Sequence, residues 1–188
     1  MAEKNNTFKI VVLVILIIAA AAGGFMGYRY MQKNNASGEA DSVLATLKRI
    51  IPTLGRETEE SMGNGRDPLP ALAVNDLDIV GCLEIPSIDL MAPVTAKGER
   101  KAGFIAVLSR SPVKGRFSLT GSKKDVFSRL ASVKPGDKVA FTDMDGVRYT
   151  YSVTTQFHLK KWDKADNDLM LSYKVDDDTR FVVGCKRL

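Results

Sequence analysis

Hydrophobic and polar residues alternate along the last part of the chain. Residues 169–174 read Leu-Met-Leu-Ser-Tyr-Lys, and a second alternating run begins at Arg180. A period of two places neighbouring side chains on opposite faces, so each run predicts a strand with one apolar and one more polar face. Between the runs, Asp176, Asp177 and Asp178 predict a polar turn.

The same pattern predicts a hairpin and a short helix further back. Residues 147–153 alternate as a half-buried strand does, Asp145 and Gly146 are a turn signal, and residues 139–142 are the partner strand. A helix is predicted over residues 125–133, where a Pro-Gly pair stops it. Its inward positions are Val126, Phe127, Leu130 and Val133. Many short strands with one or two short helices predict a mainly β fold, an antiparallel or mixed barrel.

The N-terminal pattern is different, because residues 10–28 carry no charge and Lys9 and Arg29 bracket them. At about 1.5 Å per residue this run spans about 28 Å, close to the thickness of a bilayer core. It predicts an uncleaved transmembrane helix, with residues 1–9 in the cytoplasm. The alternative is a cleaved signal peptide, for which the alanines at residues 19–22 supply a cleavage site.

Residues 29–75 are predicted to be a stem that contains a helix and a linker. Asp41 or Ser42 is a helix cap, and residues 52–70 carry the glycine, proline and charge of a flexible linker. The apolar positions at helical spacing are Val43, Leu44, Leu47, Ile50 and Ile51. We expect this helix to pack on the domain that follows, since it lacks the strongly basic face of a membrane-surface helix.

Composition narrows the function classes. The chain has 188 residues and a net charge of +5, with the basic excess spread along its length. Nucleic-acid binding is therefore not expected, because it needs a concentrated Lys/Arg stripe. One histidine and two cysteines cannot build an ordinary zinc site, and the aspartate turn lacks the spacing of a calcium loop. Without a glycine-rich phosphate loop either, we expect no metal and no cofactor.

Short motifs in residues 76–188 follow one another in the order of a known family. Residues 83–90 read Leu-Glu-Ile-Pro-Ser-Ile-Asp-Leu, residues 118–122 read Ser-Leu-Thr-Gly-Ser, and residues 169–174 precede an arginine that opens the next strand. These motifs resemble those of sortases, the cysteine transpeptidases of Gram-positive cell surfaces, of class B or D. The resemblance implies a sortase-like β-barrel over residues 76–188, placed outside the membrane.

The resemblance also assigns catalytic positions, and two of them carry other residues. Tyr173 and Lys174 stand where the family has Thr-Cys, and Ser122 stands where it has its histidine. Arg180 matches the family's arginine. The resemblance therefore implies a degenerate site, a pseudo-sortase. Arg180 remains a candidate for binding a carbonyl or carboxylate, with an ion pair to the aspartate turn as the equal alternative.

A displaced nucleophile is the rival interpretation. Cys185 or Cys82 would attack the peptide, with His158 as the acid. Alternation along the strand from Arg180 turns Cys185 to the opposite face, so we expect it in the core, and Cys82 also fits a packing role. A disulfide between the two cysteines would suit an extracellular domain. His158, at the end of a strand, fits a surface position.

The sequence thus favours a single-pass membrane protein with an extracytoplasmic sortase-like domain. Its expected role is to bind a peptide or to scaffold a surface-protein or pilus partner. The alternatives are an active cysteine transpeptidase that attaches proteins to the cell wall through a non-standard cysteine, and a purely structural surface protein.

We predict that residues 10–28 stay on the mature protein as one helix, because the uncharged run reaches spanning length. N-terminal sequencing of the membrane-bound protein tests this. A mature chain that begins near Gly23 would identify a signal peptide instead.

Overall fold

Short strands are the main regular secondary structure of the protein, as the alternation predicts. The computed structural model describes residues 38–51, 54, 65–99, 101–160 and 167–188. Within these residues lie an α-helix over residues 38–50, two short 3₁₀ helices and nine strands. The strands are β1 (Leu72–Val74), β2 (Leu77–Ile85), β3 (Leu90–Thr95), β4 (Ile105–Ser109), β5 (Phe117–Thr120), β6 (Lys138–Asp143), β7 (Arg148–Leu159), β8 (Leu169–Lys174) and β9 (Arg180–Arg187), and the 3₁₀ helices are η1 (Pro86–Ile88) and η2 (Leu130–Ser132).

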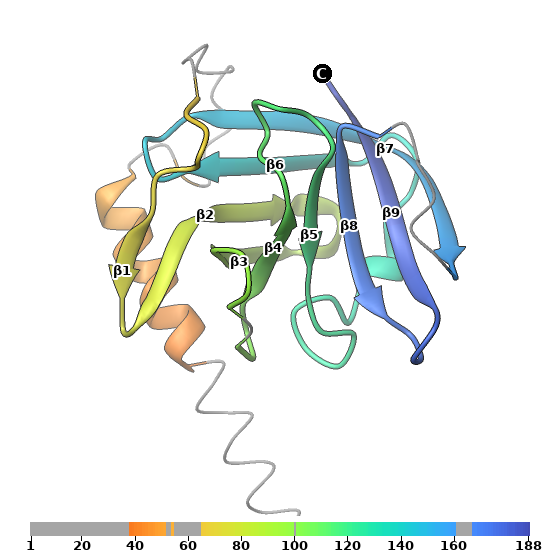
Figure 1. Cartoon of the computed structure of the whole chain (residues 1–188), viewed down its shortest axis with the longest axis horizontal. Coiled ribbons are helices and arrows are strands. Elements are labelled where there is room, and N and C mark those ends of the chain that lie inside the picture. Colours follow the sequence, from red (N-terminus) through yellow and green to blue (C-terminus); the bar gives the residue numbers. More distant parts are fainter. Residues whose placement is uncertain (1–37, 52–53, 55–64, 100, 161–166) are drawn as a thin grey trace, which may run out of the picture. The chain divides into compact units, whose positions relative to one another are not determined.

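Backbone pairing closes eight of these strands into a barrel (Figure 1). The order is β2-β3-β4-β5-β8-β9-β7-β6, and β6 pairs back onto β2. Two neighbouring pairs, β3–β4 and β5–β8, are parallel, so the expected mixed β-barrel is confirmed. At the closing pair the backbones approach closely: a Cβ added to Gly81 would lie 2.3 Å from the carbonyl oxygen of Thr142. Glycine at this position lets β6 lie against β2.

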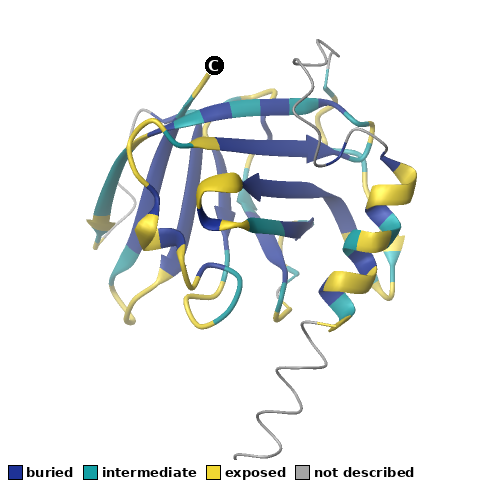
Figure 2. Cartoon of the chain, turned by 180° about the vertical axis from the view of Figure 1, so that it is seen from behind, coloured by how far each residue is buried: buried dark blue, intermediate teal, exposed yellow. Residues whose placement is uncertain are grey.

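The core inside the barrel is an apolar cluster to which nearly every strand contributes, and the strands are buried along much of their length (Figure 2). Phe117 and Phe141 pack edge to face with ring centroids 5.0 Å apart, and the ring of Tyr149 lies 6.1 Å from that of Phe141. Leu119 and Val183 are among the other fully buried members of this cluster. Burial of each such side chain contributes roughly 1.5–3 kcal/mol relative to exposure, which makes this cluster the main source of stability.

A second apolar cluster joins the helix of residues 38–50 to the barrel. It contains Val43, Leu47 and Ile51 from the helical segment, together with Ile79 and Cys82 of β2. The buried positions recur at helical spacing and form a single stripe, so the helix lays one face against the outside of β2, and the burial colours in Figure 2 show this.

One predicted element is wrong. Residues 123–129 form turns, and only the 3₁₀ helix η2 follows, where a helix over residues 125–133 was expected. Phe127, Leu130 and Val133 are buried as predicted, whereas Val126 is half-buried. The three buried positions are spaced by three, which matches the three residues per turn of a 3₁₀ helix better than the 3.6 of an α-helix.

The outer face of β8 also differs from expectation. Leu169, Leu171 and Tyr173 face the core as the alternation predicts. On the opposite face, however, Met170 and Ser172 are buried too. For Ser172 the reason is local, because the guanidinium of Arg180 on β9 bonds to its hydroxyl.

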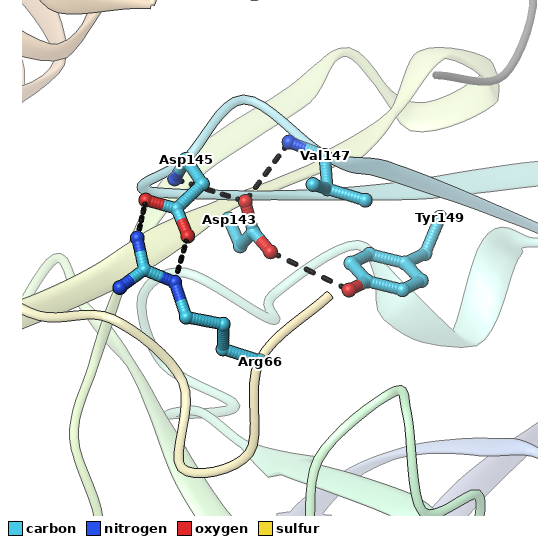
Figure 3. Close-up of polar contacts among 5 residues, drawn as sticks. All are labelled: Arg66, Asp143, Asp145, Val147 and Tyr149. Atoms are coloured by element: carbon cyan, nitrogen blue, oxygen red, sulfur yellow. Dashed lines mark hydrogen bonds and ion pairs between the residues drawn. The ribbon is translucent and has the colours of Figure 1, made fainter. Parts of the chain in front are cut away.

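A polar cluster ties residues 65–66 to the β6–β7 hairpin (Figure 3). Arg66 makes two hydrogen bonds of 2.7 Å to the carboxylate of Asp145. Asp143, which is fully buried, accepts hydrogen bonds from the N–H groups of Asp145 and Val147 and from the hydroxyl of Tyr149. Burial raises the pKa of the Asp143 carboxyl, and the two backbone donors oppose that rise.

Several expectations about the N-terminal part lie outside the described residues. These include the predicted membrane span at residues 10–28 and most of the predicted linker. Among the residues that the structure describes, no helix combines the length and the apolar composition needed to cross a bilayer.

We predict that Leu47→Ala lowers the free energy of unfolding by about 2–5 kcal/mol, because it empties a fully buried position between the helix and the barrel. Ile50→Ala on the same helix is the control, since Ile50 is 50% exposed. It should change stability by roughly 0.5 kcal/mol or less. Urea unfolding of both variants measures the difference, and equal effects would show that the helix does not stabilise the barrel.

Candidate functional site

A cavity of about 390 Å³ opens on the outer face of the barrel, beside the ends of β5, β8 and β9. Its polar and charged lining consists of Lys101, Thr120, Ser122, Lys174 and Arg180. Its apolar lining consists of Ala102, Phe104, Ala106 and Gly121. An adjoining hollow shares Gly121, Ser122 and Lys174 and adds Lys123, Lys124 and Val175. The two together form a groove, which we call the basic groove.

Strand register brings three of these side chains together. Thr120 on β5 is the parallel neighbour of Ser172 on β8, and Lys174 is the antiparallel partner of Arg180 on β9. Phe117 and Leu119 point into the core, so Thr120 points outward. The alternation that fills the barrel interior therefore also gathers hydroxyl, amine and guanidinium groups on its outside.

Two hydroxyl groups hold the guanidinium of Arg180. Its Nη2 donates to Thr120 Oγ1 at 2.6 Å and to Ser172 Oγ at 3.2 Å. The Ser172 hydroxyl in turn donates to the carbonyl of Leu119 at 3.3 Å. These bonds orient a permanently charged group at the floor of the groove, where it can meet a carbonyl or carboxylate oxygen.

Lys174 lies at the mouth of the groove. Its amine is 2.6 Å from the carboxylate of Asp177, and the two side chains are 57% and 97% exposed. Asp176 accepts hydrogen bonds from the N–H groups of Asp178 and Thr179, so it organises the β8–β9 turn. An exposed ion pair of this kind contributes about 1 kcal/mol at most, so a ligand can exchange with Asp177 at little cost.

Ser122 comes directly after Gly121, where the end of β5 packs closely against the turn that follows. A Cβ added to Gly121 would lie 2.7 Å from side-chain atoms of Val126 and Phe127, so only glycine lets the turn pack here. The Ser122 hydroxyl accepts a hydrogen bond of 3.3 Å from the N–H of Lys124. A hydroxyl in this setting can donate to a ligand but has no useful protonation change near neutral pH.

Tyr173 points away from the groove. Its ring stacks on Phe181 at 5.0 Å inside the barrel, and the amine of Lys123 lies 5.7 Å from its centre. Of Tyr173 and Lys174, only Lys174 therefore reaches the groove.

Neither cysteine is in the groove. Cys185 lies in the barrel core and Cys82 in the cluster under the helix, each fully buried and each a free thiol. The disulfide considered from the sequence is thus not formed, because the two thiols belong to different clusters. Burial raises the pKa of the Cys185 thiol to about 12, and burial is also the largest cause of the raised pKa of Cys82.

His158 is separated from Arg180 by the sheet itself. It is exposed, pairs with Phe181 across β7 and β9, and meets that ring edge to face at 5.4 Å. Because Phe181 and Arg180 are consecutive on β9, their side chains lie on opposite faces. The structure therefore does not bring Arg180, His158 and a thiol into one cluster.

Sequence reasoning missed several groove residues. The hydroxyl groups of Thr120 and Ser172 were not singled out, although each sits at a polar position of an alternating strand. Phe104 and Ala106 reach the groove through the fold of β4 and the turn before it, and they carried no local signal. Their role depends on contacts between distant segments.

Comparison with known proteins identifies the family. The family model of the sortase domain matches residues 83–186, more than half of the chain. A search of curated proteins finds no match. Among solved structures, sortase A of Listeria monocytogenes is 21% identical with a TM-score of 0.51, over 58% of this chain and 87% of that one.

Two further structures cover more of this chain. Sortase C1 of Streptococcus agalactiae is 20% identical with a TM-score of 0.53, over 79% of this chain and 89% of that one. A lid mutant of sortase A from Corynebacterium diphtheriae is 20% identical with a TM-score of 0.52, over 79% and 92%. At these identities the likeness shows the fold. With the family match, it follows that this chain belongs to the sortase family.

We predict that neither native thiol reacts with a thiol reagent at pH 8 in the folded protein, because both are buried and protonated there. Both should react after unfolding in guanidinium chloride. The Lys174→Cys variant supplies the matched control, since a thiol at this exposed position should react in the folded state. Mass spectrometry of alkylated protein counts the modified sites, and rapid native labelling of Cys82 or Cys185 would contradict the buried placement.

Proposed function

We propose that this protein is a catalytically inactive sortase that binds a peptide of a surface or pilus protein outside the membrane. The observation that supports this proposal is the set of side chains that line the basic groove. An amine at Lys174 and a hydroxyl at Ser122 stand where the family resemblance assigns a thiol and an imidazole, while Arg180 is retained.

The chemistry of transpeptidation supports this assignment. The reaction needs a thiolate to attack the peptide carbonyl, a general acid for the leaving amine and a donor for the oxyanion. Lys174 supplies an amine where the resemblance assigns the cysteine, so the thiol nucleophile is missing at this position. Ser122 cannot serve as the acid. Of the three roles, only the donor role of Arg180 has a side chain suited to it.

Peptide binding remains available to the same groove. The guanidinium of Arg180 is held in place by Thr120 and Ser172 whether or not a nucleophile is present. Phe104 and Ala106 provide an apolar wall for side chains of an extended peptide. Loss of catalysis with retention of this geometry supports a role in holding a partner.

The proposed location rests on the N-terminal sequence and on the family. The uncharged run of residues 10–28 has the length of a membrane-spanning helix. Sortases act at the cell surface, which supports an outer position for the domain that follows. There it would retain a surface-protein or pilus partner, with no metal, cofactor or nucleic acid involved.

We predict no turnover when the full chain, in detergent, is incubated with sorting-signal peptides and an amine acceptor. An active sortase in the same assay is the positive control, and a thiol alkylator is added in parallel. Mass spectrometry detects the ligated product.

The rival transpeptidase makes a distinct prediction in this assay. Turnover that is abolished by the alkylator and by Cys185→Ala or Cys82→Ala would overturn the inactive assignment. In the absence of turnover, Cys185→Ala should act only on stability, with a loss on the order of 1 kcal/mol from the cavity it leaves.

A further inference from the structure

The charged residues that the structure describes along the basic groove are all basic. Five basic side chains line it, namely Lys101, Lys123, Lys124, Lys174 and Arg180. Among the lining residues that the structure describes, none is Asp or Glu. A concave surface with charges of one sign concentrates ligands of the other sign, so this groove favours an anionic group.

The partners of these cations can be exchanged for a ligand. Lys174 pairs with Asp177 at an exposed ion pair, and Lys101 pairs with Glu39 in a contact that is only partly exposed. Such pairs are weak, because water screens both charges. An anion inside the groove would instead meet Lys174 and Arg180 together, at neighbouring positions of paired strands.

The geometry favours a carboxylate over a long polyanion. Both N–H groups of Arg180 Nη2 are donated to Thr120 and Ser172. A carboxylate would therefore meet another part of the guanidinium with one oxygen and Lys174 with the other. Three exposed aspartates, Asp176, Asp177 and Asp178, follow Lys174 in the β8–β9 turn. They would repel the repeating charges of a phosphate polymer, whereas a single negative group lies inside the basic part.

The rest of the groove is suited to a peptide chain. Ala102, Phe104 and Ala106 form an apolar wall beside the charged floor. A cavity of about 390 Å³ has room for a small number of residues rather than a lone ion. Apolar walls with a few convergent polar groups are typical of sites that fix one end of a ligand.

We propose that the basic groove binds an extended peptide by its free C-terminal carboxylate, with Arg180 and Lys174 on the carboxylate and the wall of Phe104 and Ala106 on the preceding side chains. This inference rests on the proposed peptide-binding function. The peptide would be one whose chain already ends here, such as the product of a cleavage, rather than an internal segment awaiting attack.

Two peptides that differ only at the C-terminus test the proposal. Acetyl-Ala-Leu-Ala-Ala is prepared with a free carboxylate and as the carboxamide, and each is titrated into the full chain in neutral detergent by calorimetry. We expect the acid to bind at least roughly tenfold more tightly at low salt, the size of a charge-assisted hydrogen bond. The difference should shrink as salt is added.

Matched variants locate the effect. Lys174→Met should reduce the preference for the acid several-fold. Lys138→Met makes the same change at an exposed lysine of β6 that does not line the groove, and it should leave the preference unchanged. Circular dichroism checks that both variants are folded, and an equal loss in both would overturn the assignment to the groove.

The possible outcomes distinguish the carboxylate site from the proposed peptide-binding function. Equal affinity for the acid and the amide would overturn the carboxylate site and leave peptide binding intact. Failure of both peptides to bind would overturn the inference and count against peptide binding itself. Displacement of the acid by inorganic phosphate at a similar concentration would identify a general anion site and overturn the choice of a peptide.

Discussion

Closure of the barrel between β2 and β6 is the constraint on which the rest of the structure depends. Once Gly81 allows β6 to lie against β2, every strand in the ring has one face inside and one face outside. The interior is filled mainly by apolar and aromatic side chains. The hydroxyl, amine and guanidinium groups of Thr120, Ser172, Lys174 and Arg180 consequently lie on the outside, where the basic groove is.

This division explains how the same short segments serve stability and binding at once. On β8, Leu171 and Tyr173 contribute to the core while Ser172 and Lys174 contribute to the groove. A shift of one residue in register would exchange the two sets and destroy both. Substitution of the groove residues, by contrast, leaves the inner set in place. The fold can therefore tolerate changes in the side chains that line the groove.

The sequence was sufficient for the parts of the structure that depend on local pattern. The β6–β7 hairpin and the strands β8 and β9 follow from the alternation of apolar and polar residues and from the turn residues. The core position of Cys185 follows because Cys185 and Phe181 are an even number of residues apart on one strand and so share a face. The helix expected over residues 125–133 failed because positions 127, 130 and 133 suit both a loose helical stripe and a 3₁₀ period, and tertiary packing decided between them. The wall of the groove was unpredictable for another reason, since Phe104 and Ala106 meet Arg180 only after distant strands have paired.

The two cysteines lie in different layers of the molecule. Cys82 belongs to the apolar cluster that includes Val43 and Leu47 of the helix, whereas Cys185 belongs to the core of the barrel. Partial opening of a protein usually releases peripheral elements before the central sheet. Undocking of the helix alone would uncover one sulfur and leave the other protected. The chain thus contains two internal reporters, and the order in which they become labelled would separate motion at the periphery from global unfolding without any engineered probe.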